Sequence, residues 1–259
     1  MIEKREFERG VNAVKLALAF LTVVPIRFGG RVIADDDLAD SRLAYPLVGL
    51  AIGLVLGGLS WALAAWAAPQ GIAAFVVIAV GAALTGGLHL DGLADSADGL
   101  FLSGDRDRRL AVMRDPHVGS YGTTAVILVI LGKYAVLSDL TGPGRGWALV
   151  IAAMVSRSLI LVSAGLADYA RRDGTGRILI ATTALRDSYW AAAVALIASA
   201  VGGGMAGVAA ASFALGWAWG MTRLAKARLG GVTGDTLGAL VETGELLVLL
   251  TLGLLGPAH

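Results

Sequence analysis

The chain has 259 residues, of which 56% are hydrophobic and only 16% are charged, and its formal net charge is +1. Its mean hydropathy is +0.74, whereas an ordinary soluble domain is about 25% charged, so lipid must cover part of the surface and no nucleic-acid partner is indicated. Because cysteine is absent, disulfides and thiolate metal sites are excluded.

The N-terminal segment combines basic residues with an apolar stretch that runs from residue 11 to 25. Three glutamates interrupt what would be the positive region of a signal peptide, and no small-residue cleavage site follows. We therefore expect a retained helix, either at the membrane interface or as a short span. The basic residues are Lys4, Arg5 and Arg9, and the glutamates are Glu3, Glu6 and Glu8.

Seven later stretches are apolar enough to be membrane helices, which need about 20 such residues. The first six form three pairs, and a short turn joins the two members of each pair. We expect an all-α, polytopic helical bundle of about seven spans that forms a single membrane-embedded catalytic domain over residues 1–259. The expected spans are residues 45–68, 71–90, 123–140, 147–167, 189–201, 205–221 and 245–257.

The basic residues indicate how this bundle is oriented. In the expected arrangement, the three short turns share one side of the membrane and four longer polar segments share the other. These polar segments, residues 1–42, 91–122, 168–188 and 223–243, hold 18 of the 21 Lys and Arg residues. The positive-inside rule then places the polar segments in the cytoplasm. Every candidate motif would lie on that face of the cell (inner) membrane.

An acidic cluster follows the second expected span. Asp91, Asp95 and Asp98 are spaced i, i+4, i+7 and would share one face of a helix. Three such carboxylates repel one another unless a cation neutralises them, and Mg²⁺ prefers oxygen ligands together with substrate phosphates. The alternatives are a solvated helix end with Asp as a cap, and a Na⁺ or H⁺ site of a transporter.

A second acidic element lies near the C-terminus. Asp235 follows a Gly-rich segment, residues 230–234, and Glu242 is seven residues further on, before Glu245. Two acidic faces could hold two metal ions around one phosphoryl group. The plain alternative is a turn that Thr233 or Asp235 caps.

Substrate phosphates also require positive charge and backbone donors. Arg114 lies beside Asp115 in a segment where Gly119 permits close backbone approach. Arg157 lies inside an apolar span and needs an anionic partner, and Arg171 lies at the end of that span as either a phosphate ligand or a snorkelling side chain. We expect Arg106, Arg108 and Arg109 to be mostly solvated, and we treat His89 as a partner that supports the substrate site.

Taken together, these segments resemble the cobalamin synthase family, also called adenosylcobinamide-GDP ribazoletransferases. Residues 85–99 read TGGLHLDGLADSADG, the family's signature, and further matches occur in the family's order along nearly the whole chain. One departure is Asp168, where the family pattern has Pro. The further matches are residues 20–25, 45–49, 113–119, 156–157, 169–174 and 231–235.

The resemblance implies an enzyme that joins adenosylcobinamide-GDP to α-ribazole or its 5′-phosphate and releases GMP, with Mg²⁺ as cofactor. The protein would act by positioning and by charge neutralisation. Metal binding would fall to Asp91, Asp95, Asp98 and Asp235. Asp98 or Asp115 would accept the hydroxyl proton, with Arg114 beside them, and the residues that hold substrate would be Arg114, Arg157, Arg171, His89 and Gly119.

Two other functions remain open from the residues alone. The spacing of Asp91, Asp95 and Asp98 is similar to that of CDP-alcohol phosphotransferases, which perform parallel chemistry on another alcohol. An ion-coupled transporter would place its acids near mid-membrane on broken helices. Here the acids lie at the end of a span beside basic loops, which favours chemistry on a phosphate ester. Apart from contact with membrane lipid, the sequence leaves partners and a homo-oligomeric state undetermined.

Overall fold

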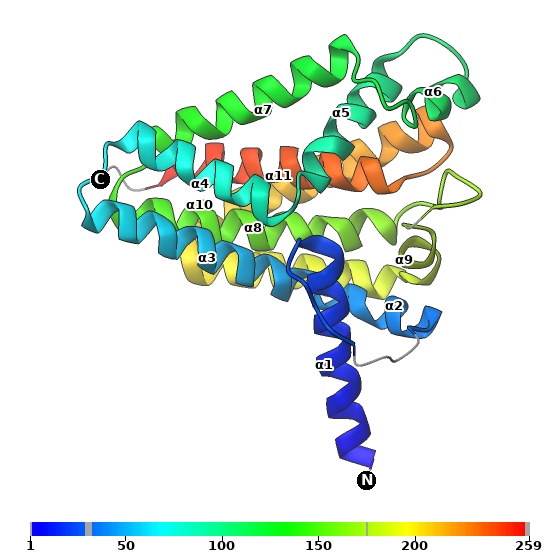
Figure 1. The fold of residues 1–259 in the computed structure, drawn as a ribbon, viewed down its shortest axis with the longest axis horizontal. Helices are drawn as coiled ribbons and strands as arrows, with labels where there is room; N and C mark the ends of the chain where they lie inside the picture. Colours follow the sequence, from blue (N-terminus) through cyan, green and yellow to red (C-terminus); the bar gives the residue numbers. More distant parts are fainter. Residues whose placement is uncertain (1, 29–32, 175, 257–259) are drawn as a thin grey trace.

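The computed structural model describes residues 2–28, 33–174 and 176–256, and within these ranges the regular elements are helices (Figure 1). A single parallel β-bridge, between Tyr169 and Val232, is the exception. The all-α prediction is confirmed. The helices are α1 (Ile2–Leu21), α2 (Asp35–Ser41), η1 (Arg42–Ala44), α3 (Tyr45–Ala65), α4 (Gln70–Leu84), α5 (Leu88–Phe101), α6 (Arg106–Val112), α7 (Ser120–Asp139), α8 (Gly142–Ala164), α9 (Gly176–Thr182), α10 (Leu185–Leu229) and α11 (Gly234–Leu255).

Helix α8 forms the centre of the bundle and is buried along nearly all of its length. Helix α3 packs closely against it because α3 carries glycine at every fourth position of the contact. A Cβ atom on Gly53 would lie 2.7 Å from Val150 Cα, and one on Gly57 would lie 2.8 Å from Gly146 O. Small residues at such contacts let membrane helices pack backbone against backbone.

The two ends of the bundle differ in character. Figure 1 shows the short connections that follow α3 and α7 at one end, and α6 and α9 at the opposite end. The second end is therefore built from segments predicted to be polar, among them residues 113–119 and 169–174 of the family motifs. This arrangement agrees with the predicted division between short turns and long polar segments.

The second expected span, residues 71–90, is not one straight helix. α4 ends at Leu84, and α5 begins at Leu88 after a bend of 87°. Gly86 and Gly87 make the bend with φ angles of +61° and +71°, which glycine adopts readily. The bend turns the acidic motif away from the direction of α4, so that it lies on a separate helix.

The expected break near residues 202–204 is present, so that α10 (Leu185–Leu229) consists of two helices joined at a kink. Gly204 has non-helical angles of φ 56° and ψ −139°. A Cβ atom on Gly207 would overlap Ser199 O, whereas eight residues of straight helix span about 12 Å. The chain therefore folds back on itself at Gly204.

The count of seven spans is not confirmed. Within the described ranges, five helices are long and apolar enough to cross a membrane, or six when the bent pair α4–α5 is counted as one span. Helix α1 does not meet this test. It runs across the direction of the bundle helices (Figure 1), buries Ala17 and Leu21, and pairs Arg9 with Asp40. An interfacial position for α1 stays a prediction.

The C-terminal region also differs from the expectation. The stretch from 223 to 243, predicted to be a polar segment, is helical for most of its length, and α11 already begins at Gly234. The predicted span 245–257 therefore starts eleven residues too late, and its last residue, Pro257, lies outside the described residues. As a consequence, Asp235, Glu242 and Glu245 are all carried by one helix.

Candidate active site

The site begins with a close contact between α5 and α11. A Cβ atom on Gly92 would lie 2.8 Å from Asp235 O, and one on Gly238 would lie 3.4 Å from Gly92 Cα. The first distance requires glycine at position 92, whereas the second is an ordinary van der Waals contact, so Gly92 is the residue that lets the two backbones come so close. The contact brings the first turn of α11, with Asp235, to the acidic face of α5.

The three aspartates of α5 share one helical face, as their spacing predicts. Asp91 is exposed, Asp95 is half-buried and Asp98 is buried. The negative charges of Asp235, Asp91 and Asp98 all act on Asp95. The predicted gathering of four carboxylates from two distant segments is therefore present in the structure.

Asp98 holds the beginning of α7. Its carboxylate accepts the backbone N–H of Gly119 at 2.7 Å through one oxygen and that of Gly122 at 2.9 Å through the other. A Cβ atom on Gly122 would lie 2.5 Å from Asp98 Oδ2, so the approach requires glycine. Asp98 thus caps a helix in another part of the chain, with the negative charge where the helix dipole favours it.

Arg171 reaches Asp235 because two family motifs pair through their backbones. The N–H of Ala170 donates to Val232 O at 2.8 Å, and the N–H of Val232 donates to Asp168 O at 2.9 Å. With the segments side by side, Arg171 Nη2 lies 2.6 Å from Asp235 Oδ2. Arg171 therefore serves as the internal counter-ion of the acidic cluster.

Asp91 and Asp95 are the two carboxylates that stay available. Among the described residues, neither makes a hydrogen bond or ion pair with the protein, whereas Asp98 and Asp235 are engaged. In the described part of the chain, no three His, Cys, Asp or Glu side chains are grouped closely enough to hold a metal ion. The four predicted metal ligands are thus near one another without forming a closed cage.

The loop before α7 is exposed and carries Arg114 and Asp115. Arg114 forms an ion pair with Asp173, which holds the pKa of Asp173 below its ordinary value. Asp115 accepts the backbone N–H of His117 at 2.9 Å and lies 2.7 Å from its Nδ1. These two contacts lower the pKa of Asp115, which makes its carboxylate a weaker base.

His89 is buried at 3% exposure, and both of its ring nitrogens lack a hydrogen-bond partner among the described residues. It lines a small cavity of about 100 Å³ together with Asp91, Asp235 and Tyr45. Buried polar atoms of this kind are usually satisfied by protein, water or ligand. His89 thus lies beside the acidic residues, and its supporting role toward substrate stays a prediction.

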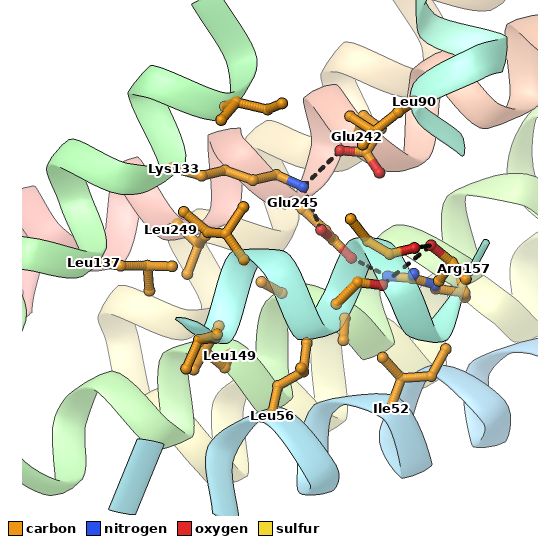
Figure 2. A pocket seen from close by; sticks show the side chains of 18 residues that line it. Ile52, Leu56, Leu90, Lys133, Leu137, Leu149, Arg157, Glu242, Glu245 and Leu249 are labelled. Atoms are coloured by element: carbon orange, nitrogen blue, oxygen red, sulfur yellow. Dashed lines mark hydrogen bonds and ion pairs between the residues drawn. The ribbon is translucent and has the colours of Figure 1, made fainter. Parts of the chain in front are cut away.

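Arg157 does not pair with the aspartates of the motif. It is 2% exposed and pairs with Glu245 inside the bundle. Lys133 of α7 completes the network, with Nζ 2.7 Å from Glu242 and 2.5 Å from Glu245 (Figure 2). The idea that Glu242 adds to a metal-binding face is thus not supported by its contacts, and the role of Arg157 toward substrate stays a prediction.

This network was missed because its members are far apart in the sequence. The available signal was a lysine inside an apolar span, since a charge at such a position needs a partner. The expectation that the three arginines of this segment are mostly solvated holds for Arg106 and Arg108, which are exposed, although Arg106 also donates to Leu229 O at 2.7 Å. It fails for Arg109, which is 5% exposed and donates to Leu100 O at 2.8 Å.

Comparison with known proteins agrees with the motif pattern. The family model described as cobalamin-5-phosphate synthase matches residues 13–253. A Klebsiella pneumoniae protein named adenosylcobinamide-GDP ribazoletransferase is 37% identical over 91% of this chain and 97% of its own length. Proteins of the same name from Geotalea daltonii and Pseudomonas entomophila are 38% and 39% identical, each over 93% of this chain and over 96% and 98% of their own lengths. No solved structure matches the chain.

Proposed function

The chain belongs to the cobalamin-5-phosphate synthase family, and on that premise we infer that it transfers the adenosylcobinamide-phosphate moiety of adenosylcobinamide-GDP to α-ribazole or its 5′-phosphate. The ribazole hydroxyl oxygen attacks the phosphorus that is esterified to cobinamide. The bond from that phosphorus to the oxygen of GMP breaks, GMP leaves, and the hydroxyl proton passes to a base.

This proposal rests on an arrangement at one end of the bundle. Two carboxylates that are available to bind a cation lie beside an arginine that is available to bind phosphate. Asp91 and Asp95 have no hydrogen-bond or ion-pair partner in the part of the chain that the structure describes, while Arg171 is held 2.6 Å from Asp235 beside them. A diphosphate with a bound divalent cation carries both negative and positive charge. The carboxylates of this site are suited to the cation, and the arginine is suited to the phosphates. Electrostatic positioning of this kind supplies most of the catalysis of phosphoryl transfer.

We propose Mg²⁺ as the cation that Asp91 and Asp95 bind. The donor set is made of oxygens, and Mg²⁺ is usually held by one or two carboxylates together with substrate phosphates and water. When bound, Mg²⁺ would neutralise charge on the diphosphate. Asp98 and Asp235 would support the site from their present positions, Asp98 through α7 and Asp235 through Arg171.

Between the two predicted bases, we propose Asp98 because of its position in the acidic cluster. Asp115 instead lies on the exposed loop before α7. Asp98 is buried within the acidic cluster, and although each oxygen accepts one backbone N–H, a carboxylate oxygen keeps a second lone pair. Arg114 and Arg171 are the candidates to bind the phosphates, and Arg114 would have to leave Asp173 to do so.

The membrane helices and the basic loops support a location in the cell (inner) membrane, with the site facing the cytoplasm. The polar end of the bundle carries the candidate site and, in sequence, most of the Lys and Arg residues. Basic loops remain cytoplasmic as a rule. The nucleotide substrate would then meet the site from the cytoplasm.

A turnover assay on purified protein tests this function. Adenosylcobinamide-GDP with α-ribazole or its 5′-phosphate should give GMP and the joined product, and removal of divalent cations should stop the reaction. Turnover of CDP-diacylglycerol, with none of adenosylcobinamide-GDP, would instead indicate a CDP-alcohol phosphotransferase. Ion counterflow in vesicles without release of GMP would indicate a transporter.

A further inference from the structure

Two spaces of very different size meet at Asp91. One is the small cavity beside His89, of about 100 Å³. The other is an open groove of about 860 Å³ between the end of α1 and the beginning of α7, which we call the α1–α7 groove. Asp91 lines both of them, so a ligand at the acidic cluster can extend into either space.

The α1–α7 groove has two apolar walls. Phe20 and Val23 form the wall on the α1 side, and Val126 and Ile127 form the wall on the α7 side. The α4–α5 bend closes its floor, where the N–H of Val23 donates to Leu84 O at 2.9 Å. The residues Phe20, Val23 and Ile127 are 38%, 59% and 50% exposed, so the groove is open.

The groove also offers polar groups, both at its floor and at the beginning of α7. The N-cap of α5 is Gly87, which has no side chain to bond the first N–H groups of the helix. Thr123 donates its hydroxyl to Gly119 O at 2.9 Å and keeps lone pairs that can accept a hydrogen bond. A ligand with an apolar body and polar substituents fits such a surface better than a purely apolar chain.

Size decides which part of the substrates can lie in the groove. A cavity of about 150 Å³ holds one benzene ring, so the 100 Å³ cavity cannot hold a macrocycle. A groove of 860 Å³ is within the range of about 300–1,000 Å³ that is typical of ligand sites. Of the two spaces described here that Asp91 lines, the groove is the one large enough to seat a large ring.

We propose that the α1–α7 groove binds the corrin macrocycle of the donor substrate, with its phosphate arm directed at Asp91. The macrocycle has an apolar rim that carries amide side chains, which matches apolar walls with a polar floor. This inference rests on the proposed function. It adds where the donor lies, and it explains how a large, partly apolar substrate reaches a site at the membrane surface.

The absence of cysteine in the chain makes a direct test available. Thr123→Cys places a thiol in the groove, and Thr124→Cys places one on the next residue, which is also exposed but does not line the groove. Each purified variant is treated with N-ethylmaleimide, with and without adenosylcobinamide-GDP, in the absence of any ribazole so that no turnover occurs.

Adenosylcobinamide-GDP should slow alkylation of the thiol at 123 several-fold and leave the rate at 124 unchanged. α-Ribazole alone should protect neither. Equal rates at 123 with and without saturating donor would overturn the proposal, and they would leave the groove to a lipid chain. Equal protection at both positions would also overturn it, because the effect would then not be confined to the groove.

A second pair of variants tests the same proposal by kinetics. Thr123→Trp should raise the KM for adenosylcobinamide-GDP several-fold without raising that for ribazole, and Thr124→Trp should change neither. GMP release by the unaltered protein is measured in parallel. No GMP release at all would count against the proposed function, whereas normal release with an unchanged donor KM in Thr123→Trp would count against the groove alone.

Discussion

At the scale of single residues, the four predicted metal ligands divide into two kinds. Asp91 and Asp95 make no bond with the described part of the protein, while Asp98 and Asp235 are held by donors from α7 and from Arg171. The first two are therefore the groups available to bind a cation. The other two shape the surroundings of that cation.

Asp95→Asn should raise the Mg²⁺ concentration needed for half-maximal activity by at least about tenfold, because even residues that only orient metal ligands cost 10–100-fold when removed. Mn²⁺ binding to the substrate-free protein should weaken in parallel. Asp173→Asn is the control, since that carboxylate is 75% exposed and pairs with Arg114. An unchanged metal titration for Asp95→Asn would contradict the metal assignment.

Gly122→Ala should reduce activity and loosen the start of α7. Its new methyl group would lie 2.5 Å from Asp98 Oδ2 and 2.8 Å from Ala94 O, and overpacking of this kind costs about 1–3 kcal/mol. Gly216→Ala is a suitable control, since a Cβ there has open space. Proteolysis of the 113–119 loop and GMP release report the two effects. Wild-type behaviour in both assays would show that Asp98 does not fix α7.

At the scale of helices, buried ion pairs connect α7, α8 and α11 inside the bundle. Lys133 on α7 and Arg157 on α8 both pair with Glu245 on α11, and Lys133 also pairs with Glu242 (Figure 2). The two cations balance the two anions. The network is therefore neutral as a whole, and removing a single member leaves a buried charge without compensation.

Lys133→Met should destabilise the protein by about 3–5 kcal/mol, the typical cost of breaking a buried ion pair from one side. Lys133 is buried, with its side chain 10% exposed. The double variant Lys133→Met/Glu242→Gln should recover part of the loss, because Arg157 and Glu245 then balance each other. Thermal unfolding in detergent measures both variants. A double variant less stable than the single one would argue against this charge balance.

The backbone bridge between Tyr169 and Val232 also connects two distant segments, and it positions Arg171. Gly231→Ala should reduce turnover more than Gly234→Ala, because a methyl group on Gly231 would overlap Asp168 O, whereas one on Gly234 meets nothing within 4 Å. Displacing the bridge moves Arg171 away from Asp235. Comparing the kcat and KM values of the two variants checks this, and equal effects would mean that the bridge does not position the site.

At the scale of the whole molecule, the bundle has one end built of short turns and one that carries the candidate site. Substrate would reach the site from the cytoplasm, with the α1–α7 groove opening beside it. In the proposed arrangement, the ribazole substrate would enter from the water while the macrocycle of the donor lies in the groove.

The orientation is testable with single cysteines. Ser103→Cys marks the end that carries the site, and Thr141→Cys marks the connection between α7 and α8; both residues are exposed. A membrane-impermeant maleimide should label the first only in inside-out vesicles and the second only in right-side-out vesicles. The reverse pattern would place the site outside the cytoplasm.

The sequence by itself determined the fold class, and it predicted the four aspartates that the structure brings near one another. Hydropathy alone requires lipid-covered helices, and a spacing of four and three residues puts Asp91, Asp95 and Asp98 on one face of a helix. The family motifs identified Arg171 and Asp235 one by one. These properties are local, so hydropathy, periodicity and short motifs are enough to predict them.

Only the tertiary structure decided which groups are engaged and which are free. The bend at Gly86 and Gly87, the approach of Gly92 to Asp235, and the pairing of Lys133 with Glu242 join residues that no local period relates. Span boundaries also depend on it, since α11 begins eleven residues before the predicted start. Such contacts depend on how helices pack against one another, and one chain's hydropathy pattern says which residues are buried without saying against which partners.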